Sequence, residues 1–435
     1  MMKQKISIFW FRRDLRLEDN AGLCRALDSG FPVLPIFIFD KKILEALENK
    51  NDRRVDYIHQ ALSIINLELK EYHSKLQTFY GRPIEIFQQL LQQYDIQSVF
   101  CNRDYEPQAI ERDTDIYNFF KTQNSAFKAF KDQVIFDKTD VLKKDGTPYT
   151  VYTPYLKKWK ELLNEKDYLA YEANCSNFLK QDFSEILSLE AIGFKKTDIG
   201  FETPNLDAKI IDEYDKYRDF PALQKTTQLG TALRFGTISI RKSVVFALQH
   251  NQTWLGELVW REFFMQILNH FPKVVHHSFK SKYDFIQWRN NEQEFDLWCA
   301  GKTGYPIVDA GMRQLNETGY MHNRVRMVVA SFLCKHLLID WRWGEAYFAE
   351  KLNDYDLSAN NGNWQWAAGC GCDAAPYFRV FNPAIQTEKF DANLEYIKKW
   401  LPEFGSNDYP KPIVEHSFAR DRALKIYGEA VKENQ

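Results

Sequence analysis

Residues 354–363, DYDLSANNGN, concentrate carboxylate and amide side chains between apolar segments of helical period. Buried polar groups in folded proteins are hydrogen-bonded, so burying this cluster without a partner would be costly. A flat polar heterocycle such as a flavin would supply the missing hydrogen bonds. The alternative is a solvated loop, which is disfavoured because Trp364, Trp366 and the segment CDAAPYF follow at once.

A second cluster surrounds Glu257. Glu257 and Arg261 are i,i+4 neighbours on one face of a predicted helix, with Trp260 close by. A surface ion pair would explain this spacing. A carboxylate and an indole facing an aromatic substrate in a cleft would explain it equally.

A third cluster lies in the segment HNRVRM at 322–327. Asn323 and Arg326 are three residues apart, as are Arg324 and Met327, so polar and soft apolar groups could line one pocket.

Thr226 and Thr227 are followed by Gln228, Leu229 and Gly230 and then by a helical stretch. Hydroxyls and backbone N–H groups at the start of a helix can bind a phosphate. An ordinary helix cap would use the same residues.

Tryptophan is distributed unevenly, because nine of the eleven lie after residue 250. Such a stock of aromatic side chains indicates a large core, a stacking surface for bases or a path for electrons.

These residues must be positioned by a chain of 435 residues, which is too long for one ordinary core. The net charge of −2 excludes a nucleic-acid binder with a basic tail, although a local basic rim is compatible with phosphate contacts. No apolar run of about 18 residues and no secretion signal are present. We therefore expect a cytoplasmic protein without a membrane anchor.

The seven cysteines are scattered, which is typical of reduced thiols. Cys370 and Cys372 form a CxC pair, but no second pair of ligands lies at a suitable spacing. We predict no metal site.

Residues 1–136 are predicted to form an α/β domain with a parallel sheet. Apolar and β-branched runs alternate there with helical segments, with strands expected at 6–11, 33–39, 98–101 and 134–136 and helices at 56–72 and 83–94. The turn after the first strand, RRDLR at 12–16, has no GxGxxG pattern. A dinucleotide bound in Rossmann fashion is therefore not expected.

Residues 137–204 are predicted to be a connector and residues 205–435 an all-helical domain. The connector is too rich in Phe, Tyr and Leu to be disordered. After residue 205 the apolar residues repeat with a helical period, with helices expected at 254–269, 307–315, 327–338 and 345–352.

Several stretches resemble the photolyase/cryptochrome family, from about residue 5 to about residue 405. They are WFRRDLRLEDN (10–20), ELVWREFF (257–264), GKTGYPIVDAGMRQLNETGYMHNRVRM (301–327), DWRWGE (340–345) and ANNGNWQWAAGCGCDAAPYFRVFNP (359–383). Within the family the chain most resembles the class I cyclobutane pyrimidine dimer (deoxyribodipyrimidine) photolyases. The resemblance implies an α/β domain, a connector and a helical domain that binds FAD, which agrees with the organisation above.

The resemblance also implies the residues that bind FAD. The phosphates and ribose would be contacted by Tyr214, Thr226, Thr227, Gln228, Leu229 and Gly230. The rest of the pocket would be lined by Trp254, Glu257, Arg261, Asn323, Arg326, Asp354 and Asp356, and Asn360 would face flavin N5.

Substrate and electron-transfer residues follow from the same resemblance. The positions that contact a dimer flipped out of DNA match Glu257, Trp260, Asn323, Met327 and Trp366. Trp288, Trp341 and Trp364 match a tryptophan chain that reduces the flavin in light, and with Glu257 and Asn360 they are the expected catalytic residues. A dimer within a duplex must be extruded to reach a cofactor. Glu257 could then stabilise charge that develops on it.

The chain departs from the family at two places. Gly230 stands where the phosphate loop often has Ser, which removes one hydroxyl contact. The segment 105–109 lacks the Asn-Glu pair that binds a folate antenna in some relatives. A second, light-collecting chromophore would therefore be a deazaflavin or another flavin, unless the chain has none.

The expected function is light-driven repair of ultraviolet-damaged DNA by a monomeric lyase. Met327, Trp366 and the lack of a second His within 322–327 favour cyclobutane dimers over six-four lesions. The alternative is a cryptochrome-type photoreceptor, which shares the flavin pocket and the tryptophan chain but needs no dimer cavity.

Overall fold

The computed structural model describes residues 3–374 and 376–432, so that Ala375 of the last motif lies outside the described residues. Contacts divide the chain into two compact units of three segments each. The α/β unit comprises the chain up to Asp137, Leu163–Leu206 and Leu229–Gln249. The helical unit comprises Lys138–Leu162, Asp207–Gln228 and the chain from His250 onward. The predicted connector thus contributes residues to both units.

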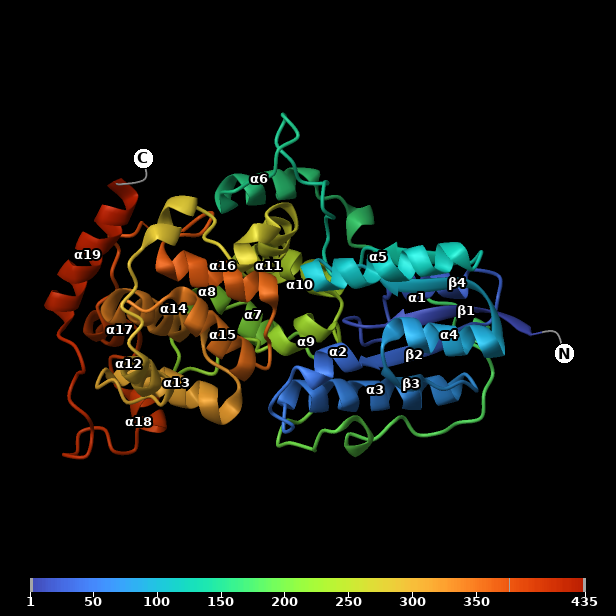
Figure 1. The fold of residues 1–435 in the computed structure, drawn as a ribbon, viewed down its shortest axis with the longest axis horizontal. Helices are drawn as coiled ribbons and strands as arrows, with labels where there is room; N and C mark the ends of the chain where they lie inside the picture. Colours follow the sequence, from blue (N-terminus) through green and yellow to red (C-terminus); the bar gives the residue numbers. More distant parts are fainter. Residues whose placement is uncertain (1–2, 375, 433–435) are drawn as a thin grey trace. The chain divides into compact units, whose positions relative to one another are not determined.

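The α/β unit is built on a five-stranded parallel sheet (Figure 1). Its strands are β1 (Gln4–Phe11), β2 (Val33–Asp40), β3 (Gln77–Gly81), β4 (Tyr94–Asn102) and β5 (Ala126–Phe130), in the spatial order β3-β2-β1-β4-β5. Its helices are α1 (Ala21–Leu27), α2 (Lys41–Glu45), α3 (Arg53–Glu71), α4 (Pro83–Gln93), α5 (Pro107–Thr122), α9 (Gly230–Phe235) and α10 (Ile240–His250).

Both faces of the sheet are covered by helices, because alternate side chains of a strand point to opposite faces. Phe9 and Phe11 of β1 join one core with apolar residues of α1 and α3. Ile8 and Trp10 join another with residues of α4 and α5. The near-continuous apolar strands predicted this arrangement, and the predicted α/β fold is confirmed.

The two edge strands differ from the prediction. Residues 134–136 are apolar and buried, but they form no strand. The fifth strand is β5, which lies earlier in the chain. The sequence of β5, AFKAF, is only half-buried, and that of β3, QTFYG, is largely polar. Edge strands lack a second neighbour, so their sequences need not be strongly apolar.

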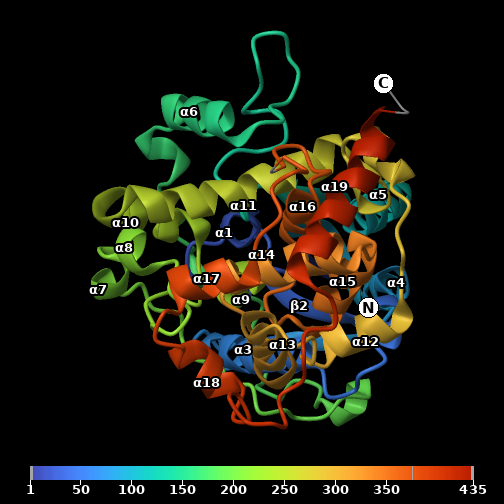
Figure 2. The same cartoon turned by 90° about the vertical axis from the view of Figure 1, so that its left-hand side faces the viewer.

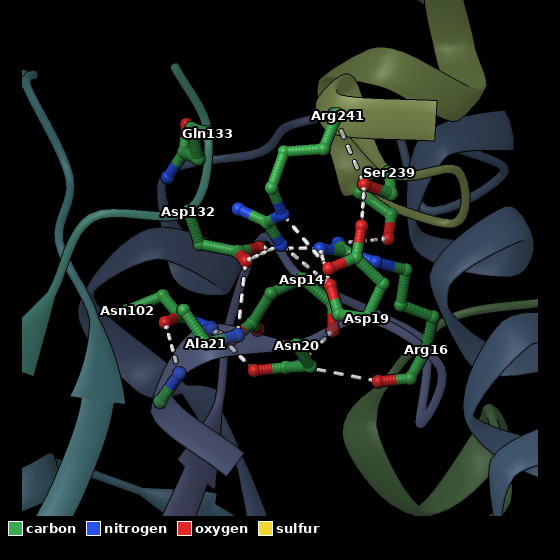
Figure 3. Close-up of polar contacts among 12 residues, drawn as sticks. Asp14, Arg16, Asp19, Asn20, Ala21, Asn102, Asp132, Gln133, Ser239 and Arg241 are labelled. Atoms are coloured by element: carbon green, nitrogen blue, oxygen red, sulfur yellow. Dashed lines mark hydrogen bonds and ion pairs between the residues drawn. The ribbon is translucent and has the colours of Figure 1, made fainter. Parts of the chain in front are cut away.

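A buried ion-pair network holds the segment after β1 within the α/β unit (Figure 3). Arg241 of α10 donates 2.8 Å to Asp19 and 2.7 Å to Asp132, and Arg16 donates 2.7 Å to Asp132. None of these side chains is more than 9% exposed. Pairing of this kind compensates for the loss of water around each charge. The RRDLR turn therefore binds other parts of its own unit.

The helical unit contains no strand among its described residues, only a single bridge between Leu142 and Pro148. Its longer helices are α6 (Tyr152–Leu162), α11 (Gln252–His270), α12 (Glu292–Cys299), α13 (Pro306–Thr318), α14 (Asn323–Ser331), α15 (Trp341–Lys351), α16 (Leu357–Ala368), α17 (Pro383–Phe390) and α19 (His416–Lys432). Shorter ones are α7 (Ala208–Ile211), α8 (Tyr214–Tyr217) and α18 (Glu395–Trp400). The predicted all-helical fold is confirmed.

Helix α16 packs against α11, α14 and α15 in the middle of this unit (Figure 2). Two glycines permit the close approach. A Cβ added to Gly362 of α16 would lie 2.2 Å from the ring of Phe264 on α11. One added to Gly344 of α15 would lie 2.1 Å from the indole of Trp364 on α16.

The predicted helices at 254–269, 307–315 and 345–352 are confirmed as α11, α13 and α15. The one predicted at 327–338 is interrupted: α14 ends at Ser331 and a wider helical turn, Phe332–Leu337, follows. Leu338 then adopts a left-handed conformation with φ of 53° and ends it. In the described part of the chain, no helix is both long and apolar enough for a membrane span.

Candidate active site

A hollow open to solvent, with about 580 Å³ of space when that solvent is included, lies in the helical unit. It is bordered by α14, α15, α16 and the segment Leu352–Asp356. Eight of the residues predicted from the sequence line it: Asn323, Arg326, Met327, Asp354, Asp356, Asn360, Trp364 and Trp366. The other lining residues include Ala330, Phe348, Leu352, Tyr355, Ala359, Asn363 and Ala367. The polar cluster at 354–363 and the HNRVRM segment therefore meet at one site.

The polar part of the hollow holds an acceptor without a partner. Arg326 donates 2.9 Å to Oδ2 of Asp354 and 2.7 Å to the carbonyl of Met321. Oδ1 of Asp354 is buried and has no hydrogen-bond partner among the described residues. Leaving a buried carboxylate oxygen unpaired is costly, so a donor on a ligand would be bound favourably there. The imide N–H of a flavin ring is such a donor.

Asn360 is oriented by Glu345 of α15. Its Nδ2 donates 2.9 Å to the carboxylate and 3.0 Å to the backbone carbonyl of Glu345. Burial raises the pKa of Glu345, and the hydrogen bond from Asn360 opposes that rise. Because the amide N–H groups are engaged, the side-chain oxygen is the atom that Asn360 can offer to a ligand.

Asp356 is the N-cap of α16, where its carboxylate accepts from the backbone N–H of Ala359 at 3.2 Å. Acceptors at this position satisfy the unpaired N–H groups of a helix start. The cap thereby fixes where α16 begins and places Asn360 in its first turn.

Helix α11 carries four predicted residues outside this lining, namely Trp254, Glu257, Trp260 and Arg261. Trp254 is buried in the first turn. Glu257 and Arg261 are one turn apart and both are half-buried. Trp260 stacks on Tyr152 of α6, with ring centres 3.6 Å apart and an interplanar angle of 10°.

Tyr152 therefore covers one face of the Trp260 indole. Its hydroxyl donates 2.6 Å to the carbonyl of Gly256, which ties α6 to α11. The sequence did not identify Tyr152, because it lies in the predicted connector and no spacing links it to Trp260.

Glu257 forms an ion pair with Arg218, which the sequence also did not identify. The guanidinium of Arg218 lies 5.5 Å from the ring centre of Tyr214 and 3.9 Å from Oδ1 of Asp219. Burial raises the pKa of Glu257, and Arg218 opposes that rise. Arg218 lies four residues after Tyr214 and eight before Thr226, and this nearness to two predicted cofactor-binding positions was the available signal.

Asp219 connects this pair to the hollow. It accepts 2.7 Å from Arg324, whose Nη1 lies 3.8 Å from the sulfur of Met327. These charged side chains thus form a continuous series, which runs from Glu257 through Arg218, Asp219 and Arg324. The series ends beside Met327, which lines the hollow.

The predicted phosphate loop, Thr226–Gly230, is shared between the units. Its first three residues belong to the helical unit and its last two to the α/β unit. Oγ1 of Thr226 lies 3.4 Å from the hydroxyl of Tyr320, whose ring centre is 5.9 Å from the guanidinium of Arg326. Gln228 has a left-handed φ of 51°, and α9 begins at Gly230.

The three predicted electron-transfer tryptophans share one hydrophobic core. Trp341 and Trp364 are buried in it, and Trp288 is half-buried against it. Trp364 contacts Phe348 and Trp298 at ring-centre distances of 5.0 and 6.1 Å. Trp288 lies edge-on to Tyr427 at 5.8 Å.

Comparisons with known proteins show the family of the chain. Residues 254–407 match the model for the FAD binding domain of DNA photolyase, and residues 7–172 match the DNA photolyase model. A deoxyribodipyrimidine photo-lyase of Synechococcus sp. is 36% identical, over 97% of this chain and 96% of that protein.

Two solved structures are similar along nearly their whole length. A class III photolyase from Agrobacterium tumefaciens has a TM-score of 0.89 and 32% identity, with 99% of each chain covered. A cryptochrome of Synechocystis sp. PCC6803 has a TM-score of 0.81 and 25% identity, covering 98% of this chain and 100% of that one. The chain belongs to the DNA photolyase family, and its helical unit carries the family's FAD-binding domain.

Proposed function

We propose that this chain recognises cyclobutane pyrimidine dimers in ultraviolet-damaged DNA and splits them in light. When bound, FAD supplies the excited electron that opens the cyclobutane ring, and the protein supplies position and electrostatics. The single observation that carries the proposal is the composition of the hollow, where Asp354, with its unpaired carboxylate oxygen, and the Met327 and Trp366 side chains line one space.

The polar side of the hollow suits the flavin. Asp354 offers a buried acceptor to an imide N–H, and Arg326 neutralises that carboxylate. Asn360 offers an oxygen to a ring N–H, held in place by Glu345. We propose that Asn323, Asp356, Tyr214 and the Thr226, Thr227 and Gln228 residues of the same unit contact the remainder of the cofactor.

The apolar side suits the flipped-out lesion. Extrusion costs less for a damaged base pair, and an extruded dimer needs apolar walls and hydrogen-bond partners for its edges. Trp260 and Trp366 are the walls in this proposal. The Trp260 indole is held by Tyr152, stacked at 3.6 Å, and by Phe264, whose ring centre is 5.4 Å away. Met327 fills the space between, while Glu257 and Asn323 meet the polar edge of the pyrimidines.

Trp364, Trp341 and Trp288 are proposed to carry an electron toward the hollow. Trp364 lines it, and the other two share its core. This set alone does not separate repair from a photoreceptor role. Repair is favoured because Met327 and Trp366, which a receptor does not need, share the hollow with the flavin-binding residues.

The test is the loss of cyclobutane dimers from irradiated DNA under blue light, with reduced flavin bound. We expect repair that stops in the dark and that fails in Glu257→Ala at saturating DNA. A chain that binds FAD but leaves the dimers intact would refute the proposal and favour the photoreceptor.

Two finer expectations stay predictions. The sequence favours class I, whereas the solved relative from Agrobacterium tumefaciens is a class III photolyase. The second expectation concerns the chemical nature of a second chromophore in the α/β unit. The visible absorption spectrum of the purified protein distinguishes a deazaflavin, a second flavin and FAD alone.

A further inference from the structure

The Arg218–Glu257 ion pair occupies the carboxylate that the proposed function assigns to the lesion. The two side chains are 28% and 32% exposed, so the pair lies at the edge of the protein interior. Arg218 holds Oε1 of Glu257. A pyrimidine edge presents an N–H and a carbonyl side by side, so a lesion that pairs with both carboxyl oxygens must take Oε1 from Arg218. The pair seen here and the lesion contact are therefore competing arrangements of one carboxylate.

We propose that Arg218 is a positioning residue that holds Glu257 ionised until a lesion arrives, and that lesion binding releases Arg218 and protonates Glu257. This inference rests on the proposed function. The proton comes from solvent and binds the carboxylate oxygen that the guanidinium leaves. No bond in the lesion breaks in this step. The released guanidinium is then free to pair with a phosphate of the bound DNA.

The charged and titratable groups around Glu257 favour this exchange. Arg218 is the group that opposes the effect of burial on its pKa, while Asp219 adds a further rise. Other titratable groups near Glu257 include the phenols of Tyr152 on α6 and Tyr214 on α8, whose own pKa values are raised by burial, and Arg261 lies one turn further along α11. Once Arg218 moves away and the lesion excludes water, the ionised form of Glu257 loses its main support.

A protonated Glu257 would serve the chemistry better than a carboxylate. A carboxylic acid donates a hydrogen bond to a pyrimidine carbonyl, the atom on which negative charge develops when an electron arrives. A carboxylate at the same place would oppose that charge. The ion pair with Arg218 would then keep the buried acid from binding its proton before a lesion is present.

Proton uptake on binding tests the proposal without any repair reaction. The FAD-loaded full chain is titrated in the dark at pH 7.5 with a duplex that contains one cyclobutane dimer. Isothermal titration calorimetry in two buffers of different ionisation enthalpy gives the protons taken up per complex. We expect the wild type to take up about one proton more than Glu257→Gln. Equal uptake by the two proteins would overturn the proposal.

Two variants at Arg218 separate positioning from a general loss of structure. Arg218→Lys keeps a cation beside Glu257, so uptake should remain near the wild-type value. Arg218→Met removes the cation that opposes protonation of Glu257, so part of the protonation precedes binding and uptake should fall toward that of Glu257→Gln. Wild-type uptake in Arg218→Met would contradict the positioning role.

The fate of the guanidinium has its own measurement. If Arg218 pairs with a phosphate, the slope of log Kd against log salt concentration should fall by about one in Arg218→Met. An unchanged slope would refute the release. An undamaged duplex of the same sequence is the control for binding. A wild type that does not prefer the damaged duplex would refute the proposed function itself.

Discussion

Replacing Gly344 with Ala tests how closely α15 and α16 must approach. The added methyl group would lie 2.1 Å from one atom of the Trp364 indole, 2.5 Å from a second and 2.6 Å from Leu333. The indole cannot turn aside easily, because Trp364 is 2% exposed and packs against Phe348 and Trp298. The helices must therefore separate or the indole must move, against neighbours on several sides.

The expected cost follows from two opposing effects. Overpacking a well-packed core destabilises by about 1–3 kcal/mol, and the short contacts here point to the upper half of that range. Replacing a helix-interior Gly with Ala returns about 1 kcal/mol. We expect a net loss of about 1–2 kcal/mol in the free energy of unfolding. Urea unfolding followed by circular dichroism would measure it.

Gly256→Ala is the matched control, because Gly256 lies within α11 and its added Cβ would be 3.4 Å from the Tyr152 hydroxyl, an ordinary contact. This variant receives the same helix-propensity gain without a clash, so it should be at least as stable as the wild type. Equal stability of Gly344→Ala and Gly256→Ala would refute the packing argument.

Three further predictions concern the helical unit. Trp364→Phe should slow the photoreduction of oxidised flavin and spare repair by enzyme reduced beforehand; normal photoreduction, measured by absorption under blue light, would indicate another electron route. Tyr152→Leu should lower stability in urea by at least about 1 kcal/mol more than Tyr152→Phe, which keeps the ring stacked on Trp260; identical midpoints would show that the stacking is unimportant. Burial lowers the pKa of Lys335 to about 7, against 10.5 in the unfolded chain. The unfolded chain then binds the extra proton between these values, so the free energy of unfolding should rise from pH 7 toward pH 10 in the wild type. Lys335→Met should lack this rise, and parallel pH profiles would contradict the assignment.

The central strands and long helices could be predicted because burial leaves a periodic apolar pattern. β1 and β2 are covered on both faces, and their sequences are almost continuously apolar. The edge strand β3 left no such pattern. The break after Ser331 was also missed, because the apolar period continues through the wider turn at Phe332–Leu337.

Residues that line the hollow could be predicted where they cluster in the sequence, as in residues 354–363 and 322–327. Their partners come from distant segments. Arg218 reaches Glu257 from 39 residues away, and the Tyr152 hydroxyl reaches the Gly256 carbonyl from 104 residues away. No spacing rule connects such pairs, since tertiary packing alone brings them together.

The ion pairs of Arg241 constrain the order in which the protein can be assembled during synthesis. Arg241 is 222 residues after Asp19 and 109 after Asp132. Until α10 leaves the ribosome, the Asp19 carboxylate lacks Arg241, and Asp132 has only Arg16 of the two arginines. A buried charge without its partner destabilises by about 3–5 kcal/mol. A nascent chain that ends at β5 has all five strands but cannot complete the α/β unit. The sheet that begins the chain therefore matures only after more than half of the chain has been made.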